Sequence, residues 1–129
     1  MPTGLRAMPA LSCTDVDLSA SDLSHAFGFR VAGTWRGEQG VARFAILQLG
    51  QITLALHKAE AVQAGPDWAV YLYIDDAAAL AELARAQGAA VEGPSDQPWR
   101  CRELRFVDRD GNQLVFAEDL APGPDGPGL

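Results

Sequence analysis

The stretch Asp96–Asp119, which reads DQPWRCRELRFVDRDGNQLVFAED, predicts two β-strands joined by a tight turn. In the first strand Leu104 and Phe106 alternate with Glu103 and Arg105, which is the two-residue period of a half-buried strand. The second strand repeats this alternation, and the letters DGN between the strands supply residues that tolerate a positive φ. One face of the hairpin is therefore apolar and packs on a core. The other face carries an acid, a base and an amide, and we expect it to form part of a functional site.

Composition sets the class of protein. A chain of 129 residues with 48% hydrophobic and 21% charged residues fits a single globular domain. The net charge of −7 argues against nucleic-acid and anionic-membrane partners. The same charge permits a cationic ligand, although acidity for solubility is the commoner explanation. No apolar run has the roughly 20 residues of a membrane span, and the first residues lack the apolar segment of a signal peptide.

The two cysteines, Cys13 and Cys101, have no metal-binding spacing and no neighbouring histidine. We therefore expect buried thiols of a reducing compartment, and a cytoplasmic location.

Hydrophobic periodicity predicts a repeated order of elements. Strands are expected at residues 9–15, 29–36, 41–49 and 51–57, then at 68–74, around 90–92 and in the two arms of the hairpin. Helices are expected at 18–27 and from about 76 to 87. Ser19 and Asp22 are predicted to cap the first helix, and Asp75 or Asp76 the second.

The letters repeat as well as the elements. Asp15 and Gly28 recur as Asp76 and Gly88, about sixty residues later, as does the glycine that begins each module's last hairpin strand. The predicted fold is α+β, with two tandem βαβββ modules whose mixed sheets form a ligand cup and whose helices cover the outer faces. We expect one domain at 8–119, with modules at about 8–57 and 68–119, a linker at 58–67 and a disordered tail at 120–129.

The duplicated module and the hairpin resemble the vicinal-oxygen-chelate superfamily, which includes glyoxalase I, extradiol dioxygenases and bleomycin-resistance proteins. The resemblance covers about Pro9 to Asp119 and rests on Gln97-Pro98-Trp99, Arg102-Glu103-Leu104 and Asp108–Asn112. The acidic charge, the length and the aromatic fifth strand look most like the bleomycin-resistance group. The sequence departs from the family pattern in having Arg100 where Gly is usual and Arg109 where Pro is usual.

The resemblance implies four strand positions at which enzymes of the superfamily hold a divalent metal with His, Glu or Gln. These positions fall near Met8, Thr53, Ala69 and Val115. A shift of one residue substitutes Pro9, Leu54, Trp68 and Leu114. None of these side chains is a ligand of the usual kind. We therefore expect no metal and no cofactor, and we expect the cup to bind a ligand without transforming it.

Six residues with aromatic or charged side chains are candidates for ligand binding. The two tyrosines and the two charged residues are expected on helix-free faces, and the two tryptophans near strand ends. They are Trp35, Tyr71, Tyr73, Trp99, Glu103 and Arg105. In the bleomycin-resistance group the matching aromatic residues resemble a stacking platform for a planar cationic drug, in a crevice between two subunits. The tyrosines have an alternative role in dimer packing, and the two charged residues an alternative as a surface ion pair.

The leading hypothesis is a metal-free homodimer that binds and sequesters a small aromatic or cationic compound, such as an antibiotic. The first alternative is a lyase, isomerase or dioxygenase of the same fold. The second is a ligand-free structural or regulatory dimer. His25 and His57 have no evident carboxylate partner, and the sequence has no nucleophile elbow or phosphate-binding loop, so no catalytic residue is assigned.

Overall fold

The computed structural model describes residues 1–123 and contains two four-stranded sheets and two α-helices. The first module comprises β1 (Ala10–Cys13), α1 (Val16–Phe27), β2 (Arg30–Arg36), the 3-10 turn η1 (Glu38–Gly40), β3 (Ala42–Leu49) and β4 (Ile52–Lys58). The second module comprises β5 (Trp68–Ile74), α2 (Ala77–Ala86), β6 (Val91–Asp96), β7 (Cys101–Val107) and β8 (Gln113–Asp119).

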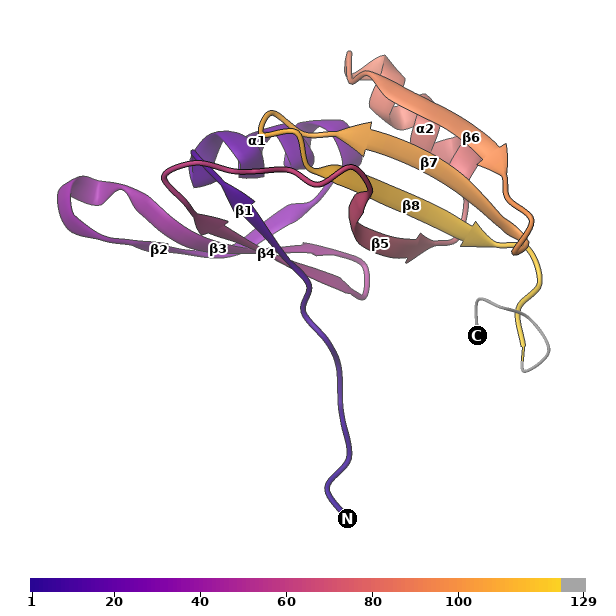
Figure 1. Cartoon of the computed structure of the whole chain (residues 1–129), viewed down its shortest axis with the longest axis horizontal. Helices are drawn as coiled ribbons and strands as arrows, with labels where there is room; N and C mark the ends of the chain where they lie inside the picture. Colours follow the sequence, from indigo (N-terminus) through magenta and orange to yellow (C-terminus); the bar gives the residue numbers. More distant parts are fainter. Residues whose placement is uncertain (124–129) are drawn as a thin grey trace.

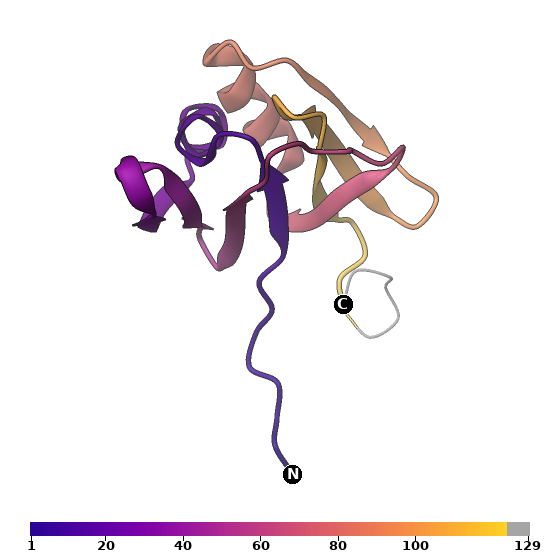
Figure 2. The same ribbon diagram turned by 60° about the vertical axis from the view of Figure 1, so that its left-hand side comes forward.

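The two sheets have the same topology. Their strand orders are β1-β4-β3-β2 and β5-β8-β7-β6. In each sheet the first strand pairs in parallel with the last, and the other pairs are antiparallel. The predicted α+β fold with two tandem βαβββ modules is confirmed. Both helices lie on the same side of the sheets, so each sheet has one helix-free face (Figures 1 and 2).

Each helix begins at an aspartate. Asp15 caps α1 by accepting a hydrogen bond from the Leu18 amide at 2.9 Å, and Asp76 caps α2 through the Ala79 amide at 2.9 Å. The predicted cap of α1 at Ser19 is wrong, because the helix begins three residues before it and Ser19 is buried in the second turn. The repeated aspartates therefore mark equivalent positions in the two modules.

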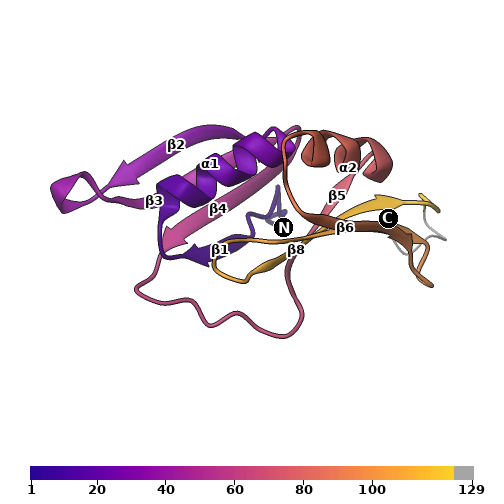
Figure 3. The same ribbon diagram turned by 90° about the horizontal axis from the view of Figure 1, so that it is seen from above.

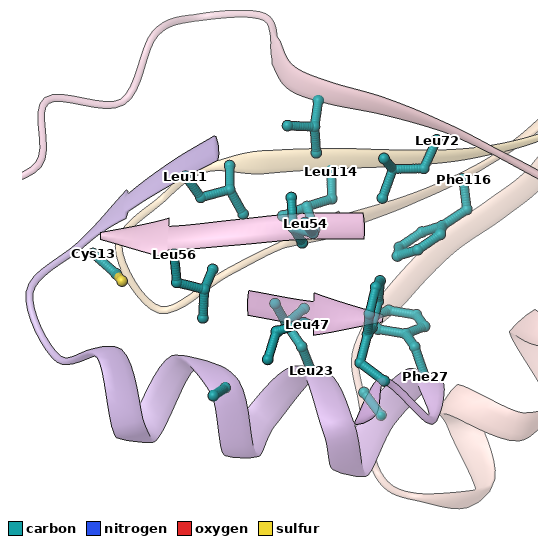
Figure 4. Packing of buried hydrophobic residues seen from close by; sticks show 14 of the residues in the cluster. Leu11, Cys13, Leu23, Phe27, Leu47, Leu54, Leu56, Leu72, Leu114 and Phe116 are labelled. Atoms are coloured by element: carbon teal, nitrogen blue, oxygen red, sulfur yellow. The ribbon is translucent and has the colours of Figure 1, made fainter. Parts of the chain in front are cut away.

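One hydrophobic core extends through both modules. Leu11 and Leu54 of the first module lie close to Leu114 of the second, and the rings of Phe27 and Phe116 are 4.5 Å apart (Figure 4). The helices also contact each other and lie in a row when seen from above (Figure 3). The two modules are therefore bound together by shared burial rather than only by the linker. Both cysteines are buried and free, as predicted.

The hairpin has the predicted alternation. Leu104 and Phe116 are fully buried on the core side. Glu103 pairs with Ala117, and Arg105 with Val115, on the helix-free side. Strand β6 is longer than predicted and contains a register shift between Glu92 and Ser95.

The end of the described chain is tied to the hairpin. The Leu120 amide donates to the Arg100 carbonyl at 2.9 Å, and the Ala121 amide donates to Asp119 at 2.9 Å. Residues 124–129 of the expected disordered tail lie outside the described residues. Within residues 1–123, no helix is both long enough and apolar enough to cross a membrane.

Candidate ligand-binding face

The helix-free face of the second sheet is built by strand alternation. On β5, Val70 and Leu72 enter the core, so Tyr71 and Tyr73 point to the opposite side. The register pairs Tyr71 with Val115 on β8, which in turn pairs with Arg105 on β7. Side chains from three neighbouring strands therefore meet on one surface.

Tyr71 is the centre of a hydrogen-bonded network on this surface. Its hydroxyl donates to Glu103 Oε2 at 2.7 Å and accepts from Trp99 Nε1 at 3.2 Å. The other carboxylate oxygen of Glu103 accepts from Arg105 Nη2 at 3.1 Å. The predicted pair of Glu103 and Arg105 is thus present. It is not a surface pair, because the Glu103 side chain is only 1% exposed.

The network keeps the Tyr71 phenol protonated. Burial raises the pKa of Tyr71, the hydrogen bond from Trp99 opposes this change, and the hydrogen bond to Glu103 raises the pKa further. Burial also raises the pKa of Tyr73, with smaller contributions from Cys101 and Asp119. Both phenols are therefore neutral hydrogen-bonding groups at neutral pH.

Four aromatic rings form the exposed part of this surface, which we call the aromatic face: Trp68, Tyr71, Tyr73 and Trp99. The ring centroids of Trp68 and Tyr71 are 5.3 Å apart, and those of Tyr71 and Tyr73 are 5.5 Å apart. Trp68, Tyr73 and Trp99 are 45%, 47% and 46% exposed. Large aromatic side chains gathered at a surface in this way mark an interaction site more often than scattered ones do.

Trp68 was not predicted as a site residue. Trp68 is three residues before Tyr71, so simple alternation places it on the opposite face. The structure has a register shift between Trp68 and Val70, which is the signature of a β-bulge and lets the Trp68 ring pack against Tyr71. Nothing in the local sequence pattern distinguishes this bulge from a regular strand.

Trp35 is the predicted site residue that stands apart. It lies on β2 in the first sheet, is 54% exposed, and packs on Phe44 with 5.6 Å between ring centroids. Gly33 lies beneath the ring, where a Cβ atom would come within 3.0 Å of it. Five of the six predicted residues therefore belong to the second module, four in its sheet and Trp99 in the β6–β7 turn, and Trp35 belongs to the first module.

The positions that would hold a divalent metal do not fit one. Val115 is fully buried and packs with Cys101, Ala117 and Tyr71. The register pairs Ala55 with Ala10 as it pairs Val115 with Tyr71, so Ala55 rather than Thr53 is the counterpart of Val115 in the first sheet. Alanine and valine side chains carry no donor atoms.

No group of three His, Cys, Asp or Glu side chains suited to a metal ion occurs among residues 1–123. Met8 is in the exposed segment before β1. His57 has Ser12 as its polar partner, with 3.2 Å between Nε2 and Oγ. His25 is exposed in the last turn of α1.

Comparison with known proteins gives a family model and several solved structures. The family model described as the Glyoxalase/Bleomycin resistance protein/Dioxygenase superfamily matches residues 7–116. A glyoxalase-related enzyme from Clostridium phytofermentans superposes with a TM-score of 0.79 at 19% identity, covering 92% of this chain and 97% of that one. A search of curated proteins found no match.

Two further structures are of proteins named for bleomycin. The bleomycin resistance determinant encoded on the transposon Tn5 has a TM-score of 0.75 at 22% identity and covers 92% of this chain and 100% of its own. The bleomycin-binding protein of bleomycin-producing Streptomyces verticillus, in complex with copper(II)-bleomycin, has a TM-score of 0.70 at 25% identity and covers 92% and 98%.

Proposed function

Since this chain belongs to the glyoxalase/bleomycin resistance protein/dioxygenase superfamily, we propose that it binds a flat aromatic small molecule carrying a positive charge and sequesters it unchanged. The site would be the aromatic face of the second sheet. The mechanism would be stoichiometric capture, so protection would scale with protein concentration and affinity.

The aromatic face is the observation that carries this proposal. Three of its rings are almost half exposed, and the fourth, Tyr71, is held by two hydrogen bonds. Preordered rings lose little side-chain entropy when a planar ligand stacks on them. Stacking contributes about 0.5–1.5 kcal/mol per aromatic pair, and a desolvated cation over a ring about 2 kcal/mol.

Glu103 serves a structural role in this proposal. Its two carboxylate oxygens are occupied by Tyr71 and Arg105, so its charge is already balanced. The attraction for a cationic ligand would come from the ring faces and from the net charge of −7. Glu103 would hold Tyr71 in its stacking orientation.

A second copy of the chain would complete the binding crevice. Trp35 is exposed on β2, in the other sheet from the tyrosines, and a homodimer would bring a comparable ring opposite the tyrosines. Sedimentation equilibrium of the wild type tests this. The Tyr71→Ala, Tyr73→Ala double variant then separates ligand binding from dimer packing. If this variant is monomeric and the wild-type dimer binds none of the tested ligands, the tyrosines serve to pack the dimer.

The ligand proposal is tested by calorimetric titration with metal-free bleomycin, with copper(II)-bleomycin and with a flat acridine dye cation. We expect saturable heat with at least one of them, and roughly tenfold weaker binding in Tyr73→Ala, as for the loss of about 1.4 kcal/mol. Leu18→Ala is the matched control, because Leu18 is 46% exposed but lies on α1.

Three outcomes would count against the proposal. If Leu18→Ala weakens ligand binding as much as Tyr73→Ala does, the aromatic face is not the binding site. The absence of heat with all three compounds would contradict the proposal, whereas its absence with the two bleomycins alone would exclude only that drug. Stoichiometric iron, manganese, nickel or zinc in purified protein, found by elemental analysis, would favour the alternative enzyme of the same fold.

A further inference from the structure

The hairpin turn of the second module reaches across to the first. Residues 108–112 connect β7 to β8, and this turn lies beside the start of α1 (Figure 1). Asp110 accepts hydrogen bonds from the Thr14 hydroxyl at 2.7 Å and the Thr14 amide at 3.2 Å. Asn112 Nδ2 donates to the Ser12 carbonyl at 2.9 Å. The turn thus closes the space between the hairpin and the connection from β1 to α1.

An ion pair completes this closure. Arg109 Nε is 2.8 Å from Asp22 Oδ2, and its Nη2 donates to the other carboxylate oxygen at 3.2 Å. Asp22 is the seventh residue after the helix cap Asp15. The position seven residues after the equivalent cap Asp76 is Leu83, which is 45% exposed.

The equivalent place in the other half of the molecule is open. The turn between β3 and β4 has only two residues, Gly50 and Gln51, and faces the connection from β5 to α2. Among the described residues, no hydrogen bond joins these two to that connection or to α2. A hollow of about 720 Å³ remains there, which we call the α2 hollow.

The walls of the α2 hollow are mainly apolar. They include Leu49 and Ile52 from the hairpin, Ile74 from the end of β5, and Leu80 and Leu83 from α2. A volume of this size accommodates a drug-sized molecule, for which pockets of roughly 300–1,000 Å³ are usual. An apolar ligand body would fill the space that the longer β7–β8 turn covers in the other module.

The polar groups of the hollow are acidic. Asp75 and Asp76 line it, and no lysine, arginine or histidine does. Asp76 Oδ1 accepts a hydrogen bond from the Ala79 amide. The Asp75 side chain is exposed and makes no hydrogen bond within the described chain. The helix dipole contributes about half a positive charge, which two carboxylates outweigh. Arg102 is held by Asp96 at 2.7 Å, and this hydrogen bond is the main cause of its raised pKa, with smaller contributions from Glu118 and Asp76.

We propose that the α2 hollow is a second binding site, separate from the aromatic face, for a small organic cation with an apolar body. Tyr73 borders both places, but the other walls of the hollow come from the β3–β4 hairpin, the end of β5 with the connection to α2, and α2 itself. The apolar groups hold the body of the ligand and Asp75 faces its charge. This site does not depend on what the aromatic face binds.

Benzyltrimethylammonium is the probe, added to the full-length protein and followed by backbone amide NMR shifts. We expect saturable shifts at Gly50, Asp75 and Leu80. Asp75→Asn should weaken binding by roughly threefold or more, the effect of losing one partly exposed charge contact. Glu82→Gln is the charge-matched control, because Glu82 lies on α2, which forms one wall, but does not itself line the hollow. It should leave the affinity unchanged.

A second pair of variants tests the space itself. Ala79→Phe places a ring in the hollow and should abolish the shifts, whereas Ala78→Phe, on the same turn but outside the lining, should preserve them. Equal binding of neutral benzyl alcohol, or shifts confined to Tyr71 and Trp99, would overturn the proposal. A dimer that Ala79→Phe dissociates and Ala78→Phe does not would also overturn it, because the hollow would then be an interface between copies.

Discussion

Arg100 has a backbone φ of 65°, in the left-handed region where glycine carries no steric cost. A side chain there costs about 1–2 kcal/mol per residue, while glycine adds about 0.5–1 kcal/mol of unfolded-state entropy. The Arg100 side chain is exposed and makes no hydrogen bond in the described structure. Its backbone closes the turn, donating to the Gln97 carbonyl at 3.0 Å. Arginine in place of the family's usual glycine therefore strains the backbone at this position but leaves the turn intact.

We predict that Arg100→Gly raises the free energy of unfolding by up to about 1 kcal/mol. Urea denaturation measures this change. Arg100→Ala is the control, because alanine keeps the conformational cost while it removes the guanidinium. Equal stabilisation by both variants would show that the side chain's charge, not the backbone, is responsible.

Tyr71 and Tyr73 are the two tyrosines of the chain, and both have a raised pKa. The folded state therefore retains phenol protons that the unfolded chain begins to lose near pH 10, the usual value. Their contribution to stability is fully present below pH 10 and is lost as the pH rises toward the higher folded values. Tyr71 is partly buried and hydrogen-bonded to Glu103, whereas Tyr73 is exposed, so the larger shift belongs to Tyr71.

At pH 10 we predict much less tyrosinate absorbance from folded protein than from protein unfolded in urea. The Tyr71→Phe variant, which leaves Tyr73 alone, should titrate at lower pH than the wild type. Identical titration of folded and unfolded wild type would contradict the buried network. Ionisation that coincides with loss of the circular dichroism signal would agree with it.

Among the elements, strand alternation and the helical spacing of apolar residues were enough to predict every strand and both helices. The same reasoning failed wherever a neighbouring element decides the outcome. Ser19 was predicted as a helix cap, but the helix begins earlier, at Val16. The side-chain direction of Trp68 depends on a bulge in the pairing of β5 with β8. The burial of Glu103 arises from Tyr71 and Arg105, and only the assembled sheet brings their polar groups to both of its oxygens.

The β7–β8 turn is the element that joins the modules through polar contacts. We predict that Asp110→Ala lowers the free energy of unfolding by about 1 kcal/mol, because the Thr14 amide and hydroxyl lose their acceptor. A double-mutant cycle with Thr14→Val isolates the hydroxyl contact, with an expected coupling energy of about 0.5–1.5 kcal/mol. Additive effects of the two substitutions would show that the contact contributes nothing in solution.

At the scale of the whole molecule, the two modules are expected to unfold together. Phe27 of α1 packs against Phe116 of β8, and buried leucines of both sheets share the same core. Neither module buries its apolar face without the other, since a single small module has too little core of its own. A substitution in one module should therefore lower the stability of both by the same amount.

Phe116→Leu tests this cooperativity, and we predict a loss of about 1–2 kcal/mol from the contacts around its ring. Trp35 reports on the first module, while Trp68 and Trp99 report on the second, so Trp35→Phe separates their fluorescence. Urea transitions from both reporters should coincide and shift together when Phe116 is replaced. The 58% exposed Val107 provides the control, because Val107→Ala should change stability by less than about 0.5 kcal/mol. Two separate transitions would mean that each module folds on its own and that the shared core is not what joins them.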